Sequence, residues 1–357
     1  MSLTTSHNDV PLSASAEKHW PGHFGKVTDE FAVLRSTCGV YELPDQAKIR
    51  VTGSDRVRWL NGMVTNNIRD LAQNHGVYSF LLNPQGHILG DLVAFHRGDM
   101  LLVETDRRQL EKILAAFDHY IIMDDVEVTD VSESQATIGL TGTGSAAVLA
   151  AAGIKTSLTQ PLEIADQAWH DIPISVVRGE YEAFPSYEIW VAPEHVAKLR
   201  ETLQTAGAAP IGQEALELYR VAMGTPLYGK DIRERDLPQE TEQQRALNFN
   251  KGCYVGQEIV ERIRSRGNVH RKFTGFRIDG KVPAIGTKTQ SQGKDVGEIT
   301  STAVIPGPAG EQAVALGYVR RELSAPGKEL EAGGTRMAVA ELPFRDLLTP
   351  QKETHHG

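Results

Sequence analysis

The segment LNFNKGCYVGQEIVERIRSRG, residues 247–267, predicts an amphipathic helix with a sharp turn at its entry. Val255, Ile259 and Ile263 recur every four residues, which places them along one face of a helix. Charged side chains occupy the other face, and Gly256 permits tight backbone geometry at the helix entry. The segment also marks a boundary, because the residue pattern before it differs from the pattern after it.

Cys253 lies at or just before the predicted start of this helix, two residues after Lys251. The positive end of a helix dipole and a nearby ammonium both lower the pKa of a thiol, so the position favours a reactive thiolate. Simple packing in a core is the alternative, because cysteine is among the residues most often buried. No histidine or second cysteine lies near enough in the sequence to complete a metal site, so no metal is expected. Cys38 has no comparable surroundings and is expected in a core.

Downstream of Arg271 the chain consists of short strand-like stretches separated by Gly and Pro turns, such as FTGFRIDG and AVALGYVRREL. The helical period is absent between them. This pattern predicts a small all-β domain, either a barrel or a sandwich.

Upstream of the segment, strands alternate loosely with helices. Residues 47–64 predict a strand followed by a helix, with Ser54 at the N-cap. Residues 76–105 predict three short strands separated by the turns NPQG and HRGD, and residues 106–121 show helical periodicity. A second unit of strand, glycine turn and helix begins near Thr137. Together these elements predict an α+β fold.

Gly142, Gly144 and Ala147 imitate the dinucleotide-binding pattern G-x-G-x-x-A. That pattern requires a βαβ unit with an acidic ribose ligand about twenty residues further on. The following segment carries Pro161 and Pro173 instead, and no second hydrophobic strand ends in a suitable acid. We therefore interpret the glycines as a structural turn.

The 357 residues suffice for two or three domains. A net charge of −9 argues against a protein that binds nucleic acid or an anionic membrane over its whole surface. No stretch approaches the roughly eighteen apolar residues of a membrane span, and the N-terminus lacks the apolar region of a signal peptide. Two cysteines cannot form a disulfide framework, which fits a reducing cytosol. We expect a cytoplasmic protein.

The string KGCYVGQE, residues 251–258, resembles the signature of the YgfZ-type folate-binding proteins. These are relatives of the glycine-cleavage T-protein, an aminomethyltransferase. The resemblance covers nearly all of the chain. It extends to CGVYELPDQAKIRVTGSDRVRWLNGMVTNNI (38–68), NPQGHILGDLVAF (83–95), RGEYEAFPSYEIWVAP (178–193) and LYRVAMGTPLYGKDIRERDLPQE (218–240).

The resemblance implies three domains around a central channel that binds tetrahydrofolate, with a C-terminal β-barrel. The expected ranges are a disordered leader at 1–23, a first α+β part of the folate-binding domain at 24–136 that is completed by 225–265, a second α+β domain at 137–224, a β-barrel at 266–348, and a flexible tail at 349–357.

The resemblance also assigns residues. The T-protein has an Asp doublet whose second carboxylate is catalytic, and here the doublet is Gly90-Asp91, so the working position is Asp91. The glutamate that binds the pterin in this family corresponds to Glu188. A carboxylate suits this role because it can accept two N–H bonds from the amino-pyrimidine edge. Lys251 and Tyr254, which flank Cys253, are expected to contact the cofactor.

An arginine of the family, four residues before the position of Arg220, is replaced by Leu216.

Two functions follow from these residues. The first is a tetrahydrofolate-binding accessory protein that supports assembly or repair of iron–sulfur clusters in client enzymes, with Cys253 as its functional thiol. The second is a tetrahydrofolate-dependent aminomethyltransferase with Asp91 essential. The resemblance favours the first, because the ordinary aminomethyltransferase lacks the cysteine. It leaves open whether the chain is an enzyme. We expect folate and iron–sulfur proteins as partners, no membrane or nucleic acid, and a monomer.

Overall fold

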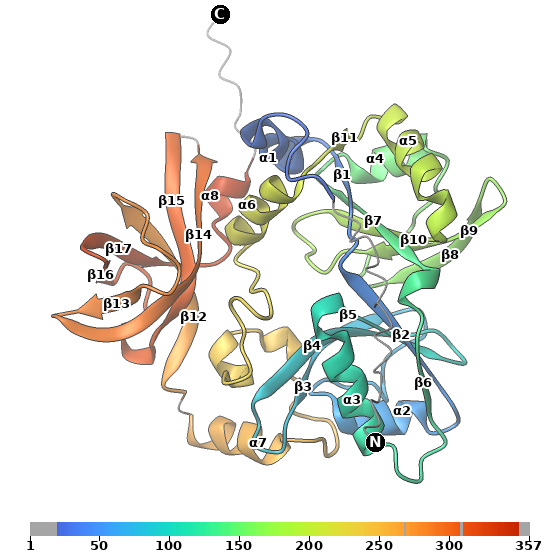
Figure 1. Ribbon diagram of the computed structural model, residues 1–357, viewed down its shortest axis with the longest axis horizontal. Helices are drawn as coiled ribbons and strands as arrows, with labels where there is room; N and C mark the ends of the chain where they lie inside the picture. The colour runs from blue at the N-terminus through green and yellow to red at the C-terminus, as the bar shows by residue number, and fades with distance from the viewer. Residues whose placement is uncertain (1–19, 268, 308–309, 350–357) are drawn as a thin grey trace, which may run out of the picture.

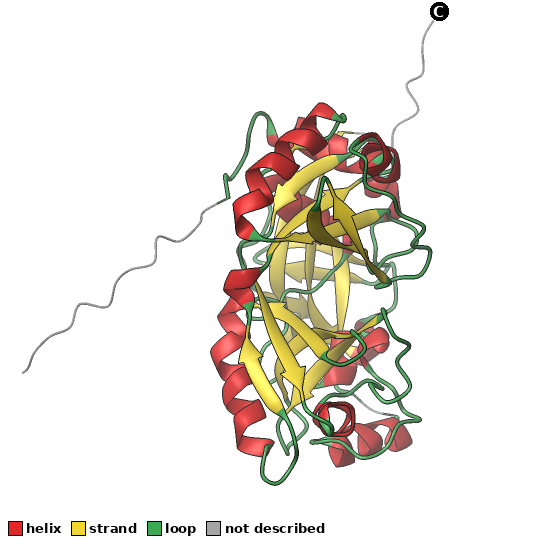
Figure 2. Cartoon of the chain, turned by 90° about the vertical axis from the view of Figure 1, so that its right-hand side faces the viewer, coloured by secondary structure: helices red, strands yellow, loops and turns green. Residues whose placement is uncertain are grey.

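The computed structural model describes residues 20–267, 269–307 and 310–349, which form two open β-sheets and one closed β-barrel (Figure 1). Helices lie mostly at the outer edges, and strands fill the middle (Figure 2). The predicted α+β class is confirmed. Among the described residues, no helix is long and apolar enough to cross a membrane.

The first sheet is antiparallel throughout and has the strand order β3-β4-β5-β2-β6. Its strands are β2 (Gln46–Thr52), β3 (Gly76–Leu82), β4 (Ile88–His96), β5 (Leu101–Asp106) and β6 (Glu127–Asp130). Helices α2 (Arg56–Met63) and α3 (Leu110–Tyr120) pack against one face of it. Burial alternates along β4, so Leu92 packs into this core while Asp91 and Val93 point to the other face.

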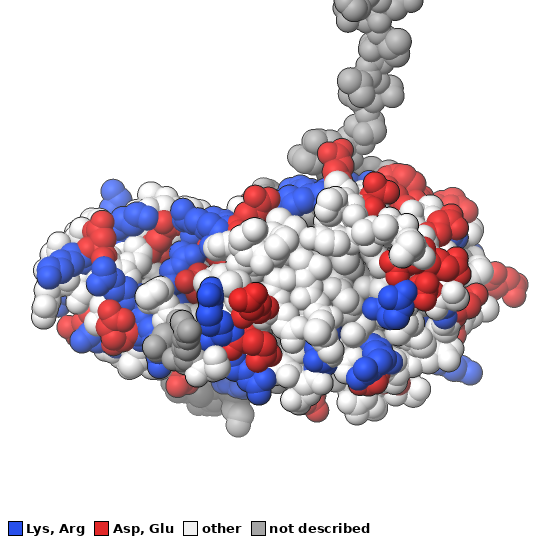
Figure 3. All heavy atoms as spheres, turned by 90° about the horizontal axis from the view of Figure 1, so that it is seen from below, with Lys and Arg blue, Asp and Glu red and all other residues white. Residues whose placement is uncertain are grey.

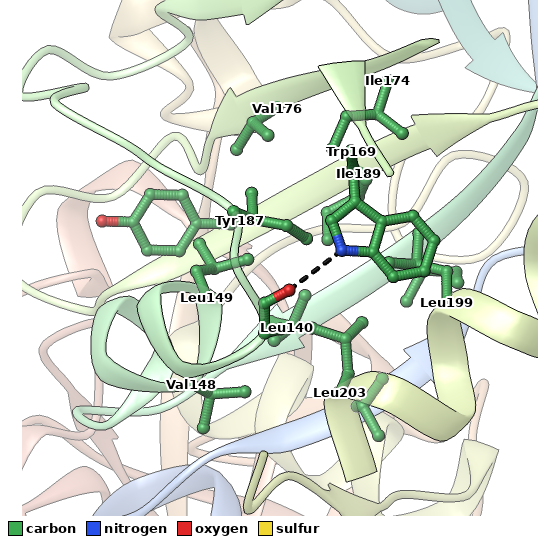
Figure 4. Close-up of a cluster of buried hydrophobic side chains, with 14 of the residues drawn as sticks. Leu140, Val148, Leu149, Trp169, Ile174, Val176, Tyr187, Ile189, Leu199 and Leu203 are labelled. Carbon is green, nitrogen blue, oxygen red and sulfur yellow. Dashed lines mark hydrogen bonds between the residues drawn. The ribbon is translucent and has the colours of Figure 1, made fainter. Parts of the chain in front are cut away.

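The second sheet has the order β11-β1-β7-β10-β9-β8. Its strands are β1 (Gly39–Glu42), β7 (Ala136–Thr141), β8 (Ile164–Trp169), β9 (Ile172–Arg178), β10 (Ser186–Val191) and β11 (Ala209–Pro210). Helices α4 (Ser145–Ala151) and α5 (Val196–Thr205) close its core. Trp169 is part of this core, and its indole Nε1 donates to the Ala152 carbonyl at 2.9 Å (Figure 4).

The chain enters the second sheet before it builds the first. Helix α1 (Val27–Ser36) leads into β1, which pairs with β7 and β11, and only afterwards does the chain form β2. The second sheet unit is therefore built from segments that are separated in the sequence by the first sheet. Trp20, within the predicted leader, is buried and donates to the Ile211 carbonyl at 2.7 Å. Residues 1–19 of the predicted leader and residues 350–357 of the predicted tail lie outside the described residues.

The predicted C-terminal β-domain is a closed barrel with the order β12-β15-β14-β13-β16-β17. Its strands are β12 (Arg271–Asp279), β13 (Lys288–Ser291), β14 (Lys294–Gly307), β15 (Gly310–Arg320), β16 (Glu329–Ala332) and β17 (Thr335–Ala340). A shared apolar cluster joins the barrel to α1, α6 (Gln213–Met223) and α8 (Arg345–Leu348). Helix α7 (Gln257–Arg266) precedes the barrel.

Short 3₁₀ helices complete the fold, at η1 (Arg107–Gln109), η2 (Ser132–Ser134), η3 (Pro193–His195), η4 (Pro238–Thr241), η5 (Gln244–Ala246) and η6 (Arg321–Leu323).

The glycine turn between β7 and α4 is structural, as expected. Both neighbours of β7 are antiparallel to it, so no βαβ unit exists there. Gly142 has φ +131°, and a Cβ at this position would lie 2.2 Å from the Thr37 carbonyl oxygen. Cys38 follows Thr37 and is buried, as predicted.

The predicted cap of α2 is wrong by one residue. Asp55, not Ser54, is the N-cap of α2, and it makes no side-chain capping bond. Its carboxylate instead accepts from the backbone N–H of Asp125 at 3.0 Å, while the Ser54 N–H donates to the Asp125 carboxylate at 2.9 Å. This exchange fastens the start of α2 to the loop before β6.

Candidate ligand-binding site

A cavity of about 630 Å³ lies between the two open sheets and α6. This volume falls in the range of sites for small organic ligands, roughly 300–1,000 Å³. Its wall combines residues of the β1–β2 connection, strands β3 to β5, the loop before β10, and α6. Five aromatic side chains line it: Tyr41, Tyr78, Tyr181, Phe184 and Tyr219. Flat apolar surfaces therefore surround a space that also carries carboxylates.

Asp91 lies on the cavity wall, and both oxygens of its carboxylate accept hydrogen bonds. The Tyr78 hydroxyl donates to Oδ2 at 2.7 Å, and Gln109 Nε2 donates to Oδ1 at 2.8 Å. Burial raises the pKa of Asp91, and these two donors oppose that rise. The two hydrogen bonds orient the carboxylate. Because its pKa is raised, the protonated form of Asp91 is more accessible near neutral pH than that of a free aspartate.

Arg245 lies behind the two tyrosines. Its guanidinium carbon is 4.3 Å from the centroid of the Tyr78 ring and 5.2 Å from that of Tyr181, and it forms an ion pair with Glu180. Burial lowers the pKa of Arg245, while the nearby Tyr78 and Asp91 oppose this. A buried cation close to Asp91 favours the ionised carboxylate.

Glu188 lies on β10, in the opposite sheet. Its Oε1 accepts from Gln46 Nε2 at 3.2 Å, and its Oε2 accepts from Trp190 Nε1 at 3.2 Å. A second carboxylate, Glu104, is buried nearby and is bonded to the wholly buried Lys48 at 2.9 Å. Burial first, and the negative charge of Glu104 second, raise the pKa of Glu188 to about 7.

The structure brings the two sequence-predicted acids to the same region at different depths. Asp91 lines the cavity directly. Glu188 lies behind Gln46, which lines the cavity together with Glu104. Glu188 therefore holds the Gln46 amide in place, and Gln46 is the group of this pair that lies on the cavity wall.

Helix α6 supplies an apolar patch and a neutralised cation to the cavity. Leu216 lines the wall at the position where the resemblance led to an arginine. Arg220 lines it too, but its guanidinium is bonded to Glu217 at 2.7 and 2.8 Å, and to Asp231 at 2.7 Å. Arg220 therefore ties α6 to its neighbours.

The Cys253 thiol is exposed, so the alternative of core packing is wrong. Helix α7 begins only at Gln257, after Gly256, which has φ +80°. Among the residues of this helix whose burial is described, Val260 is the buried one, whereas the predicted stripe residues Ile259 and Ile263 are half-buried. The buried face of α7 therefore differs from the stripe predicted from the sequence.

Lys251 anchors the segment that carries the thiol. It is 7% exposed, and its Nζ donates to the carbonyls of Asn61, Val64 and Asn66 at 2.5, 2.5 and 2.7 Å, at the C-terminal end of α2. Burial lowers the pKa of Lys251 to about 7. Tyr254 packs in an adjoining apolar cluster. The cavity is lined by residues of the range 41–227, so Lys251, Cys253 and Tyr254 lie outside its wall.

Cys253 precedes α7 by four residues, and α7 lies at the lower end of the molecule in Figure 1, the end that faces the viewer in Figure 3. On this face a broad uncharged area separates a side rich in acidic groups from the barrel side, where basic groups are frequent (Figure 3). Within the described ranges, no group of three or more His, Cys, Asp or Glu could hold a metal ion.

Sequence reasoning missed Tyr78, Gln109, Arg245 and Gln46. One signal was available for Tyr78, which pairs with Val93 across the β3–β4 hairpin and is therefore a diagonal neighbour of Asp91. Gln109 and Arg245 reach the site through tertiary contacts that no local pattern marks.

The fold and the site define a class: two α+β sheet units and a closed barrel arranged around a cavity of small-molecule size. Within this class, the model of the GCVT N-terminal domain matches residues 12–251, and the model of the glycine cleavage T-protein C-terminal barrel domain matches residues 271–346. The chain therefore belongs to the GCVT family.

Relatives and a solved structure agree with this family. The aminomethyltransferase of Halothermothrix orenii is 24% identical over 91% of this chain and 93% of its own length. The aminomethyltransferase of Streptomyces coelicolor is 28% identical over 96% of both. The crystal structure of glycine cleavage system aminomethyltransferase T from Bartonella henselae superposes with a TM-score of 0.80, at 22% identity over 90% of each chain. The last similarity establishes a shared T-protein fold.

We expect Glu188→Gln to change how stability depends on pH. Between about 4.3, the pKa of an unfolded glutamate, and about 7, the folded protein holds a proton that the unfolded chain releases. The free energy of unfolding of the wild type therefore loses this contribution as pH rises through that window. Urea unfolding at about pH 5 and about pH 8 should show a smaller loss in the variant. An identical loss in both proteins would contradict the assignment.

We expect Lys251→Met to destabilise the protein by about 1–3 kcal/mol, because three buried carbonyls lose their donor. The wild type should also gain stability as pH rises from about 7 to about 10, because only the unfolded chain then binds the proton. The variant should lack this gain. Thermal unfolding measures both effects.

The matched control is Lys281→Met at an exposed lysine, which should leave the thermal midpoint unchanged. Equal midpoints for the two variants would show that Lys251 is not an anchor.

Proposed function

We propose that the chain binds tetrahydrofolate, or a one-carbon derivative of it, in the cavity and acts as an aminomethyltransferase. The observation that carries this proposal is Asp91, a carboxylate oriented by two donors on the wall of a cavity of suitable size. Membership of the GCVT family and the names of the relatives support the same reading.

The residues present fit a reduced pteridine. Its pyrimidine ring is flat, and the amino-pyrimidine edge carries several N–H donors. The aromatic wall offers surfaces for stacking. Gln46 and Glu104 on the wall, with Glu188 behind Gln46, offer acceptors for the N–H groups of the amino-pyrimidine edge. The apolar Leu216 adds to the wall.

Bound tetrahydrofolate would supply the nitrogens that accept a one-carbon unit. Asp91 would accept a hydrogen bond from a nitrogen of the ligand and hold a proton as the charge on that nitrogen changes. Its raised pKa brings proton uptake closer to neutral pH, whereas Tyr78 and Gln109 keep the ionised form accessible. Asp91 is therefore the acid or base of this proposal, and Glu188 fixes the ligand's orientation through Gln46.

We expect isothermal titration calorimetry with tetrahydrofolate to give a saturable heat for the wild type. Asp91→Asn should weaken binding about 10- to 100-fold, the loss of one hydrogen bond to a charged group, and Glu188→Gln should weaken it less, because Glu188 acts through Gln46. Glu194→Gln, at an exposed acid on η3, is the matched control and should bind like the wild type. Absence of heat with the wild type would refute the proposal.

A second candidate function is supported by the exposed thiol. Under this proposal the chain is a YgfZ-type accessory protein that binds folate and supports iron–sulfur clusters in client enzymes. An exposed Cys253 could react with a partner, and the buried Lys251 holds the loop that presents it. The family membership and the aminomethyltransferase relatives favour the transferase, so the accessory role stands second.

A complementation assay separates the two candidates. In a strain that lacks its own copy of the protein, Cys253→Ala should abolish rescue of iron–sulfur enzyme activity if the accessory role holds, while Cys38→Ala serves as the buried control. Full rescue by Cys253→Ala would remove the thiol from the mechanism. A glycine-cleavage assay with purified lipoyl carrier protein tests the transferase, and sustained ammonia release that requires Asp91 would establish it.

A further inference from the structure

The Gln109 side chain fills a gap in the first sheet next to Asp91. Strands β4 and β5 pair from His96 to Val93, and β5 then turns into η1, so the strand pairing ends before Asp91. The backbone N–H of Asp91 donates to Gln109 Oε1 at 3.0 Å instead. Gln109 thus replaces a strand partner at this point.

The same amide controls the carboxylate. A backbone N–H can only donate, so Oε1 of Gln109 must face it and Nε2 must face the other way. Nε2 donates to Asp91 Oδ1 at 2.8 Å. One side chain therefore fixes both the backbone and the carboxylate of Asp91, in a reciprocal pair of bonds.

Gly90 provides the space for this arrangement. A Cβ at residue 90 would lie 2.9 Å from Gln109 Oε1 and 3.3 Å from Ile113 Cδ1. Gln109 is 3% exposed and is not part of the cavity wall, so it has no route to the ligand of its own. Its hydrogen bonds to Asp91 are its connection to the site.

We propose that Gln109, in the space left by Gly90, is the positioning residue that orients the Asp91 carboxylate toward the cavity ligand. The inference rests on the proposed tetrahydrofolate site. Without Gln109, Tyr78 alone would hold the carboxylate, which could then rotate about its Cβ–Cγ bond and accept a proton at Oδ1.

The other charged or titratable groups around Asp91 cannot replace this donor. Arg245 contributes positive charge from η5, Asp106 contributes negative charge from the end of β5, and Tyr228 lies in the loop after α6. None of the three donates a hydrogen bond to Oδ1, whose partner is Gln109. Loss of Gln109 therefore leaves burial to raise the pKa of Asp91 further.

A double-mutant cycle on tetrahydrofolate affinity tests the inference. Calorimetry compares the wild type, Gln109→Leu, Asp91→Asn and the double variant at neutral pH. We expect Gln109→Leu to weaken binding about 10-fold in the wild-type background and less than about 2-fold in the Asp91→Asn background, because the residue acts through Asp91. Equal losses in both backgrounds would show a merely structural role and overturn the inference.

Two further readouts make the test independent of folding defects. Gly90→Ala leaves Gln109 in the sequence but crowds it, so it should reproduce the loss of affinity. The fall in affinity at low pH should begin at a higher pH in Gln109→Leu than in the wild type. Glu188 is present in both proteins, so this difference belongs to Asp91. An unshifted pH profile would overturn the inference, whereas a wild type that binds no tetrahydrofolate would refute the proposed function itself.

Discussion

The buried carboxylate of Asp231 joins helix α6, which lines the cavity, to the loop after it and to the barrel. Arg220 of α6 donates to it at 2.7 Å, the backbone N–H of Leu227 donates at 3.0 Å, and Ser301 of β14 donates at 2.8 Å. The acid is completely buried, so removal of any donor would leave a charge with incomplete compensation, which is costly in a protein interior. Helix α6, the following loop and the barrel are thereby fixed to one another, and α6 is a wall of the cavity.

The chemistry of the cavity is set by buried carboxylates that accept hydrogen bonds from neutral donors. Asp91 on one sheet and Glu188 on the other each have a donor at both oxygens, and in both cases burial is the largest cause of a raised pKa. Such groups are oriented before a ligand arrives, so little ordering is needed on binding. They also gain or lose protons nearer to neutral pH than free carboxyls do, which suits them to hold a nitrogen base whose charge changes.

Much of the fold could be predicted from the sequence because its signals are local. The turns NPQG and HRGD separate β3, β4 and β5, and the loss of helical period after Arg271 indicates the barrel. The alternation along β4 places Asp91 opposite the core residue Leu92. The crossing of β1 into the second sheet could not be predicted, because β1 pairs with β7, nearly a hundred residues later, and with β11.

The site was predictable only in part. Asp91 was found through the resemblance, but its partner Gln109 comes from another element and contacts it through an amide that no motif records. The position of Cys253 relative to α7 was misjudged because Gly256 takes a left-handed conformation, which delays the helix to Gln257. The segment that carries the exposed thiol is anchored by Lys251 to the end of α2, a contact between residues about 190 positions apart that no local pattern marks.

The most direct test is a crystal structure of the protein grown with tetrahydrofolate. We expect the pteridine ring in the cavity between the two sheets and α6, with a nitrogen of the ligand about 3 Å from an oxygen of Asp91. A ligand bound elsewhere on the protein, with the Asp91 carboxylate facing only Tyr78 and Gln109, would contradict it.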